Sequence, residues 1–293
     1  MKRIFIVGNP TSGTGKYIKY HHLLVEQLKA EQIDFQSYRT TSENNATAVI
    51  KTYFDDSFSD IIVIGGDGTL NETVNGLTRN VPIGIIPAGT GNDYAKCFAL
   101  GKSIKEIIST ATSGKVVSVD LGLCNNRKFL NGVGVGFDGQ IVADLVQKQT
   151  WLRGVVKYYY HVLSILGSYS ARVFNYTIDG ENKKENLILL CIAKGTTFGG
   201  GFRLTPQAKL DSGKLAVCTI GALSPLKRFL NIYRLQNGTH HMLKEINLME
   251  ADSVTISENP LLESHIDGEY FGQPPFSFSI QKDALQVRCI KLL

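Results

Sequence analysis

The stretch Asp60-Ile-Ile-Val-Ile-Gly-Gly-Asp-Gly-Thr-Leu-Asn-Glu72 (residues 60–72) decides how the first part of this chain folds. Its apolar start is typical of a strand that is buried on both faces of a parallel sheet. The glycines that follow allow close backbone approach, and a helix that begins after them presents N–H groups and a positive dipole end to an anion. The stretch therefore predicts a buried strand, an anion-binding turn and a helix.

The same alternation of strand and helix runs through the first 120 residues or so. Strands are predicted at residues 3–7, 35–39, 60–64 and 82–86, with apolar residues at helical spacing between them. Such a pattern indicates a parallel sheet that is covered by helices on both faces. Beyond Gly114, short runs of alternating polar and apolar residues predominate. We expect an α/β, Rossmann-like three-layer domain over residues 1–121 and a mainly-β, sandwich-like domain over residues 122–293.

Around Asp179-Gly180 the second part contains a hairpin signal, with strands predicted at residues 172–178 and 187–193. The connection between these strands is then longer than two residues. His240-His241 lacks a partner at metal-ligand spacing, so both histidines are expected at the surface.

Composition bounds the class of protein. The chain has 293 residues, of which 43% are hydrophobic and 19% are charged, as in folded globular proteins with room for two cores. Its net charge of +5, without blocks of Lys or Arg, favours anionic small molecules or a membrane surface over nucleic acid. No apolar run approaches the roughly 20 residues of a membrane span, and no secretory leader is recognisable, which predicts a cytoplasmic protein. The five cysteines lack the spacing of a disulfide framework or a zinc site.

Glycine-rich turns follow three of the predicted strands, at residues 8–13, 65–69 and 88–93. The carboxyl ends of parallel strands share one edge of the sheet, so the three turns are expected to converge on one anion site. A single such turn could be a plain strand-to-helix connection. Gly8 and Gly13 have the spacing of the two glycines in a Walker phosphate-binding loop. That motif needs a lysine directly after the second glycine, and Thr14 stands there instead. Gly134–Gly139 spells G-x-G-x-x-G, but no strand with an acidic end follows at the distance that a dinucleotide site requires.

These turns resemble, in the same order, the nucleotide-binding half of the diacylglycerol kinase catalytic family, which includes bacterial lipid kinases and sphingosine kinases. Residues 136–139, 199–206 and 267–269 resemble later motifs of that family, so the resemblance covers nearly the whole chain. It implies an ATP- and Mg²⁺-dependent kinase of phospholipid biosynthesis, with its active site in a cleft between the two domains. The substrate would be the hydroxyl of a diacylglycerol-like or long-chain-base lipid. GGDGT alone is shared with NAD kinases and phosphofructokinases.

The resemblance implies a set of residues that bind ATP on the glycine turns: Asn9, Pro10, Ser12, Gly13, Thr40, Gly65, Gly66, Gly68, Thr69, Leu70, Asn71, Glu72, Thr90 and Asn92. Asp67, between glycines, is suited to hold Mg²⁺ or its waters beside a triphosphate. The resemblance implies that Asp93 and Asp120 join Asp67 in an acidic, metal-linked network. Glu72 can equally complement a helix dipole, and Asp120 by itself is typical of a turn.

Asp267-Gly-Glu269 is, on its residues alone, typical of a hairpin turn. The resemblance implies instead that this acidic pair supplies the base for the lipid hydroxyl, and the sequence does not choose between Asp267 and Glu269. One departure concerns Ser212, which stands where the family has an aspartate that helps to bind a structural Mg²⁺. Serine is a poorer Mg²⁺ ligand than a carboxylate, so this ion is absent or is reached by Asp211.

The implied partners are ATP and a lipid at the inner membrane surface, with no nucleic acid and no transmembrane segment; a homodimer is left open. Residues 151–169 predict a helix whose apolar side chains Trp151, Val155, Tyr159, Leu163 and Leu166 line an acyl-chain groove, rest on the membrane or pack on the β domain. Three rival functions stay open, namely a soluble NAD kinase-like enzyme, a catalytically silent nucleotide- or lipid-binding relative and, least favoured, an NAD-dependent oxidoreductase.

Overall fold

A computed structural model of the chain describes residues 2–13, 15–147 and 154–293. The chain divides into two compact units, residues 1–119 with 283–293, and residues 120–282. The sequence reading assigned residues 283–293 to the second part, and the structure differs. Residues 286–288, at the end of the long strand β16 (Phe276–Cys289), pair in parallel with residues 82–84 of the first unit. Arg288 there forms an ion pair of 2.6 Å with the buried Asp60.

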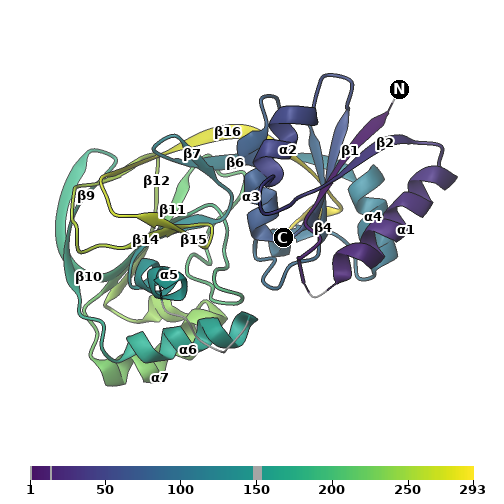
Figure 1. Cartoon of the computed structure of the whole chain (residues 1–293). Helices are drawn as coiled ribbons and strands as arrows, with labels where there is room; N and C mark the ends of the chain where they lie inside the picture. Colours follow the sequence, from purple (N-terminus) through teal and green to yellow (C-terminus); the bar gives the residue numbers. More distant parts are fainter. Residues whose placement is uncertain (1, 14, 148–153) are drawn as a thin grey trace. The chain divides into compact units, whose positions relative to one another are not determined.

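The first unit is a parallel sheet with the strand order β2-β1-β3-β4-β16. Figure 1 shows helices on both of its faces, with α1 and α4 on one and α2 and α3 on the other. The predicted parallel α/β architecture is therefore confirmed. The elements are β1 (Arg3–Gly8), α1 (Lys16–Ala30), β2 (Asp34–Arg39), α2 (Ala46–Tyr53), β3 (Asp60–Gly65), α3 (Asp67–Gly76), β4 (Pro82–Pro87), η1 (Tyr94–Cys97), β5 (Phe98–Ala99), α4 (Ile104–Ser113) and β17 (Lys291–Leu292).

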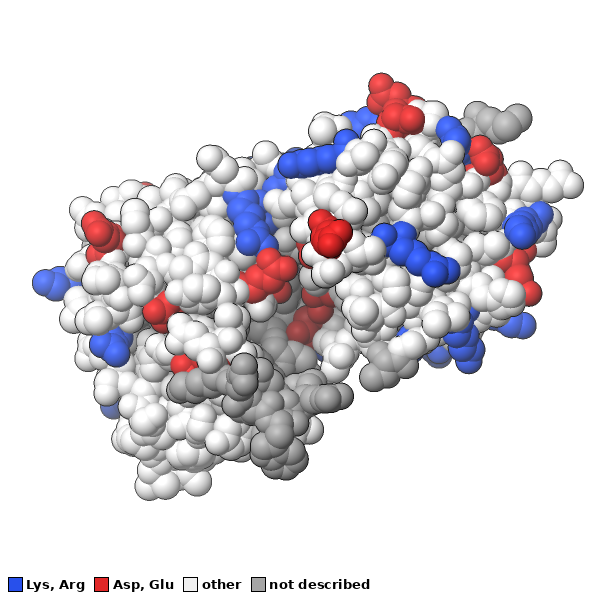
Figure 2. Space-filling view, in the orientation of Figure 1, with Lys and Arg blue, Asp and Glu red and all other residues white. Residues whose placement is uncertain are grey.

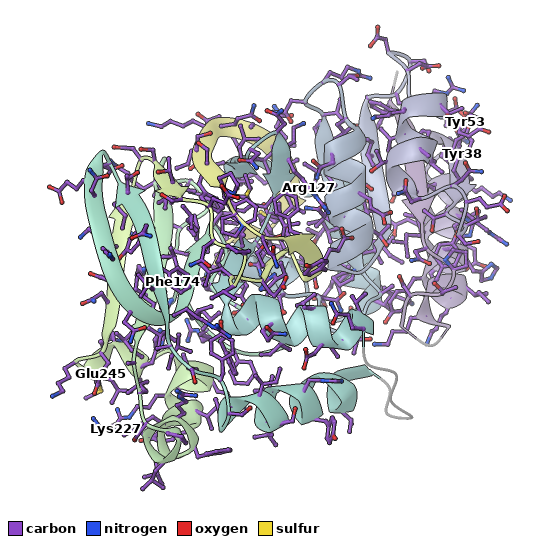
Figure 3. The ribbon with its side chains drawn as sticks, turned by 60° about the vertical axis from the view of Figure 1, so that its left-hand side comes forward. Tyr38, Tyr53, Arg127, Phe174, Lys227 and Glu245 are labelled. Atoms are coloured by element: carbon purple, nitrogen blue, oxygen red, sulfur yellow. The ribbon has the colours of Figure 1, made fainter. Side chains whose placement is uncertain are left out.

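Successive side chains of the central strands serve opposite faces of this sheet, as the period of a strand requires. Ile4 and Ile6 belong to the apolar core that α1 and α4 cover. Phe5 instead packs its ring against Tyr38 on the other face, at 4.8 Å between centroids. Tyr38 stacks in turn on Tyr53 of α2, as Figure 3 shows. Each fully buried aliphatic or aromatic side chain contributes roughly 1.5–3 kcal/mol to folding, so both helix layers are anchored.

The second unit is built on antiparallel strands. Strand β10 lies at its centre and pairs with β8, β9 and β11. One apolar core includes Phe174, and a second one lies between the strands and the helices α5, α6 and α7 (Figures 1 and 3). The elements are β6 (Lys115–Cys124), β7 (Arg127–Phe129), β8 (Gly132–Gly136), α5 (Phe137–Gln147), α6 (Gly154–Leu166), β9 (Arg172–Ile178), β10 (Glu181–Ala193), β11 (Leu215–Gly221), α7 (Pro225–Asn237), η2 (His240–Met242), β12 (Ile246–Ala251), β13 (Val254–Ile256), β14 (Ser264–Ile266) and β15 (Glu269–Gly272).

The hairpin between β9 and β10 is tighter than its sequence predicts. Its loop is only Asp179-Gly180, whose φ angles of 49° and 86° are both in the left-handed region. This is the backbone of a two-residue hairpin turn that matches the twist of the strands. The prediction of a longer connection is wrong because residues 181–186 are polar, yet they pair with β9 along their whole length.

Helix α6 buries Val162, Ile165 and Leu166, whereas Leu163 and Tyr160 are exposed. The predicted stripe places Leu163 and Leu166 on one packed face. This is wrong for Leu163, which is exposed while Leu166 is buried. Trp151 lies outside the described residues, and the side chains of Val155 and Tyr159 are not described. None of the helices in residues 2–13, 15–147 and 154–293 has the length and apolar character that a membrane crossing needs.

Candidate active site

The three glycine-rich turns meet at the carboxyl edge of the first unit's sheet. The N–H of Asn9 donates to the carbonyl of Ile64 at 3.1 Å, and the N–H of Ala88 donates to that of Gly65 at 2.8 Å. A Cβ atom on Gly13 would lie 1.8 Å from the carbonyl oxygen of Ala88. The turns thus touch one another beside β1 and β3, where the strand order reverses and where open α/β sheets bind ligands.

Close backbone contact explains why glycine occupies the second and third turns. A Cβ atom on Gly89 would stand 2.5 Å from the Cα atom of Gly66. At Gly65 the close neighbour is a side chain instead, since a Cβ atom there would stand 2.7 Å from Oγ1 of Thr69. Helix α3 begins at Asp67 and has no side-chain cap on Gly66. The first N–H groups of a helix lack intrahelical partners and attract anions, so this half-exposed edge is suited to a phosphate.

Asp67 shapes the third turn. Its carboxylate accepts the N–H groups of Asp93 and Tyr94, both at 3.0 Å, and so caps the short helix η1. Asn92 completes the turn with a φ of 51°, and its side chain bonds both the N–H and the carbonyl of Gly89. Asp93 forms an ion pair of 2.6 Å with Lys96. The carboxylate of Asp67 thereby joins the second and third glycine turns.

The other predicted ATP-binding residues differ in their exposure. Thr40 follows β2 directly at the same edge, where its N–H donates to the carbonyl of Gly8 at 2.9 Å. The side chains of Leu70, Thr69 and Asn71 are buried. Asn9, Pro10, Ser12, Gly13 and Gly68 are half-buried, and Thr90 is exposed.

Glu72 has a specific partner in the first unit. Its Oε2 accepts the N–H of Ala46 at 2.9 Å, at the first residue of α2. A carboxylate in this position satisfies an unpaired helix donor and complements the helix dipole. Glu72 therefore does complement a helix dipole, as one of the two interpretations of its sequence position predicts. The helix is α2, however, and not α3, to which Glu72 belongs.

In the second unit, Asp267 and Gly268 form the turn between β14 and β15, with φ angles of 47° and 85°. The Asp267 carboxylate accepts three backbone N–H groups, from Leu130 at 2.8 Å, Asn131 at 2.9 Å and Gly132 at 2.8 Å. These bonds hold the carboxylate in one orientation.

Glu269 lies in a different environment from Asp267. Its side chain is 43% exposed and forms an ion pair with Arg127, which Figure 3 labels. The Arg127 guanidinium also lies over the ring of Phe271, 5.7 Å from the centroid. The two carboxylates of the predicted pair are therefore held in different ways, one by backbone amides and the other by an arginine.

A buried Asp–His pair lies directly behind this turn. The carboxylate of Asp138 is 2.7 Å from Nε2 of His265, and the N–H of Gly268 donates to Nδ1 of the same ring at 3.2 Å. Burial lowers the pKa of His265, but the Asp138 carboxylate outweighs this effect and raises it overall. Sequence reasoning missed His265, although Asp138 belongs to a quoted motif and His265 stands two residues before Asp267.

The predicted metal ligands have separate surroundings. Asp67 and Asp93 flank Gly91, whose added Cβ would be 3.3 and 3.6 Å from their carboxylate oxygens. Asp120 instead pairs with Lys194 at 2.9 Å. Asp211 is exposed. Within the described part of the chain, no three His, Cys, Asp or Glu side chains are grouped as metal ligands.

An apolar cavity opens among α5, α6, α7 and strands β10 and β11 of the second unit. Its cavity volume is about 80 Å³, and it lies between residues such as Phe137, Leu189 and Leu235. His240 lines it and is fully buried, with Nε2 3.1 Å from the carbonyl of Leu204. The prediction that His240 lies at the surface is therefore wrong, whereas His241 is exposed. Burial lowers the pKa of His240.

Comparison with known proteins matches nearly the whole chain. Residues 3–124 match the diacylglycerol kinase catalytic domain, and residues 131–289 match the YegS C-terminal NAD kinase beta sandwich-like domain. The diacylglycerol kinase of Staphylococcus carnosus (strain TM300) is 28% identical over 98% of this chain and 94% of its own length. That of Bacillus subtilis (strain 168) is 28% identical over 95% and 93%.

Solved structures share the fold. A diacylglycerol kinase from Bacillus anthracis str. Sterne superposes with a TM-score of 0.77 at 24% identity, over 98% of this chain and 96% of that one. An NAD kinase from Archaeoglobus fulgidus in complex with ATP gives a TM-score of 0.52 at 13% identity, over 98% and 93%. Both likenesses concern the fold alone.

Proposed function

Because the chain belongs to the diacylglycerol kinase catalytic family, we propose that it transfers the γ-phosphate of ATP to the hydroxyl of a diacylglycerol-like lipid. The observation that carries this proposal is the convergence of three glycine turns on one sheet edge, in a chain whose two parts match both domains of such kinases.

ATP binds with its phosphates on the glycine turns of the first unit. The support is the first turn of α3, whose N–H groups and positive dipole end favour a polyanion. Gly66 and Gly89 let the second and third turns pack against each other beside this helix start, since a Cβ atom on Gly89 would lie 2.5 Å from the Cα atom of Gly66. Asn9 and Thr40 flank the same edge and contact the nucleotide.

Mg²⁺ accompanies the nucleotide, and its chemical contribution is to neutralise the charge on the transferred phosphoryl oxygens. Mg²⁺ keeps several waters and takes only one or two carboxylates besides the phosphates. The residues at the edge fit that requirement. Asp67 stands at the proposed phosphate-binding turn, and the carboxylates of Asp67 and Asp93 both lie close to Gly91. These two residues would hold the ion or its waters.

Asp267 accepts the proton of the lipid hydroxyl. In the balanced reaction the hydroxyl oxygen bonds to the γ-phosphorus, the bond from that phosphorus to the β–γ bridging oxygen breaks, and ADP leaves. Fixed geometry supports Asp267 in this role, because three N–H groups orient its carboxylate and catalysis depends on such preorganisation. Glu269, bound to Arg127, positions the turn.

The lipid tail enters the apolar cavity of the second unit. Its lining is predominantly aliphatic and aromatic, with Asp138 among the few polar residues. Asp138 also bonds His265, two residues before the proposed base, so the cavity wall and the acidic turn are linked directly. A cavity of this kind suits acyl chains rather than a soluble dinucleotide.

Incubation with γ-labelled ATP and Mg²⁺ tests the function. The protein is offered vesicles that contain diacylglycerol, vesicles that contain a long-chain base, or NAD in solution. We expect label in phosphatidic acid alone. Label in NADP alone would contradict the lipid kinase, label in the long-chain base would change the lipid class, and ATP binding without transfer to any acceptor would indicate a silent relative.

The lipid is reached by contact of the helices α6 and α7 with the membrane. Three apolar side chains of α7, Leu226, Phe229 and Leu230, are exposed by 68%, 45% and 62%, and Tyr160 of α6 is exposed by 53%. Figure 2 shows almost no charged side chains over α7 on the face that it draws. Amphipathic helices with such faces insert into the membrane interface.

The double variant F229E/L230E is expected to bind vesicles about 10-fold more weakly or worse, because each lost apolar contact costs roughly 1.5–3 kcal/mol. Cosedimentation with phosphatidylglycerol-containing vesicles measures the effect. The matched control is I18E, which places a charge on another exposed apolar residue, on α1. Binding by F229E/L230E equal to that of I18E would contradict the proposed membrane face.

A further inference from the structure

A lysine ammonium is completely buried among oxygen atoms in the second unit. Lys194 follows β10 directly, and its side chain is 0% exposed. Its Nζ lies 2.9 Å from Oδ2 of Asp120, 2.9 Å from the carbonyl oxygen of Lys214 and 3.4 Å from Oγ of Ser212. An ammonium has three N–H donors, and here they face three oxygens from two separate segments of the chain.

The loop before β11 folds around this ammonium. The hydroxyl of Ser212 lies 3.2 Å from the carbonyl oxygen of Lys209 and 3.3 Å from that of Lys214. Gly213 has a φ of 66°, and its N–H donates at 2.7 Å to Oδ2 of Asp120, the same oxygen that the Lys194 ammonium contacts. Carboxylate, carbonyl and hydroxyl oxygens are what a hard cation such as Mg²⁺ takes as ligands. The positive charge at their centre is nevertheless that of Lys194.

The charges explain how this arrangement is possible in a buried place. The carboxylate of Asp120, whose side chain is 4% exposed, and the ammonium of Lys194 carry opposite charges at 2.9 Å. Ser212 adds no charge. In the family that the sequence resembles, this position carries an aspartate that helps to bind a structural Mg²⁺. Ser212 is exposed here, and an aspartate in its place would add a carboxylate within reach of the Lys194 ammonium, which already pairs with Asp120. The neutral serine and the buried lysine are therefore complementary features.

The donor set does not fit a divalent cation as it stands. An ammonium has no lone pair with which to bind a metal, and its charge repels one at this short distance. We propose that the Lys194 ammonium permanently replaces the structural divalent cation in this loop, so that the second unit folds independently of Mg²⁺. This inference concerns the stability of the second unit and holds whatever the chain phosphorylates.

Thermal unfolding and metal content of the full-length chain test the proposal without nucleotide present. We expect the Tm of the unchanged protein to be the same in EDTA and in millimolar Mg²⁺. After dialysis, elemental analysis should find no bound metal at a one-to-one ratio. A lower Tm in EDTA, or one Mg²⁺ retained per chain, would overturn the proposal.

Variants that remove the Lys194 ammonium, or that also add a carboxylate at position 212, test the arrangement from the opposite direction. K194M removes the ammonium that pairs with the buried Asp120 and should lower the Tm markedly, whereas the matched control K214M removes an exposed lysine that pairs with Asp252 and should change it little. K194M/S212D restores two carboxylates without the ammonium. Saturating Mg²⁺ should raise its Tm by about 5–10 °C, and should not raise that of K214M.

Equal Tm values for K194M and K214M would contradict the role of the ammonium. A folded K194M/S212D variant whose Tm does not respond to Mg²⁺ would contradict the assignment of this loop as a cation position. If K194M/S212D does not fold, the metal content and EDTA response of the unchanged protein decide the question by themselves.

Discussion

D267N is expected to lower kcat for lipid phosphorylation by about 10²–10⁴-fold, the usual contribution of a positioned general base. The substitution removes the proposed proton acceptor. It also leaves the three backbone N–H groups, which donate to the carboxylate, facing either a side-chain NH₂ group or an amide oxygen that is a poorer acceptor. Initial rates at saturating ATP and lipid, together with the Tm of the variant, separate the chemical effect from a disturbed turn.

E269Q is the matched control, because it neutralises the neighbouring carboxylate and removes its ion pair with Arg127. We expect a smaller loss of kcat, since in the proposed mechanism Glu269 positions the turn and Asp267 takes the proton. A near-normal kcat for D267N combined with a large loss for E269Q would transfer the role of the base to Glu269. Near-normal rates for both variants would remove the acidic turn from the mechanism.

D67N is expected to lower kcat/KM for ATP by about 10³-fold, a loss of roughly 4 kcal/mol of transition-state stabilisation. Two effects combine in this variant. The carboxylate that holds the N–H groups of Asp93 and Tyr94 is lost, which loosens the third glycine turn, and the proposed acidic ligand of a nucleotide-linked Mg²⁺ would be removed as well. Steady-state kinetics at several Mg²⁺ concentrations measures both effects.

E72Q provides the comparison for D67N, since Glu72 belongs to the same helix but bonds the first N–H of α2. It should cost up to about 1 kcal/mol of stability, as the loss of a helix cap does, and leave kcat/KM nearly unchanged. If D67N retained the kcat/KM of E72Q, Asp67 would have no part in binding the nucleotide or its ion.

The first unit could be predicted because its signals are local. The apolar run at residues 60–64, the glycines after it and the helical spacing after those all lie within one βα segment, and each reports its own conformation. Parallel strands must then share a carboxyl edge, so three turns predicted separately imply one site. The same reasoning failed for residues 181–186, because a polar strand at a hairpin carries no alternating pattern.

The acidic turn was identified by its residues, but its environment was not. Nothing local indicates that Asp267 bonds amides 135–137 positions away, or that His265 faces Asp138 across 127 residues. The end of β16 shows the same limit, since residues 286–288 join a strand that lies 204 positions earlier.

By itself, the sequence determined the alternation of strands and helices in the first unit, its parallel sheet, the glycine turns and the family, because these depend on periodicity and on motifs of a few consecutive residues. Only the tertiary structure decided which charges are buried and what compensates them, as at Lys194, Asp120 and Ser212. The physical reason is that the free energy of a charge depends on the atoms around it in space. Those atoms come from segments that the chain brings together only when it folds.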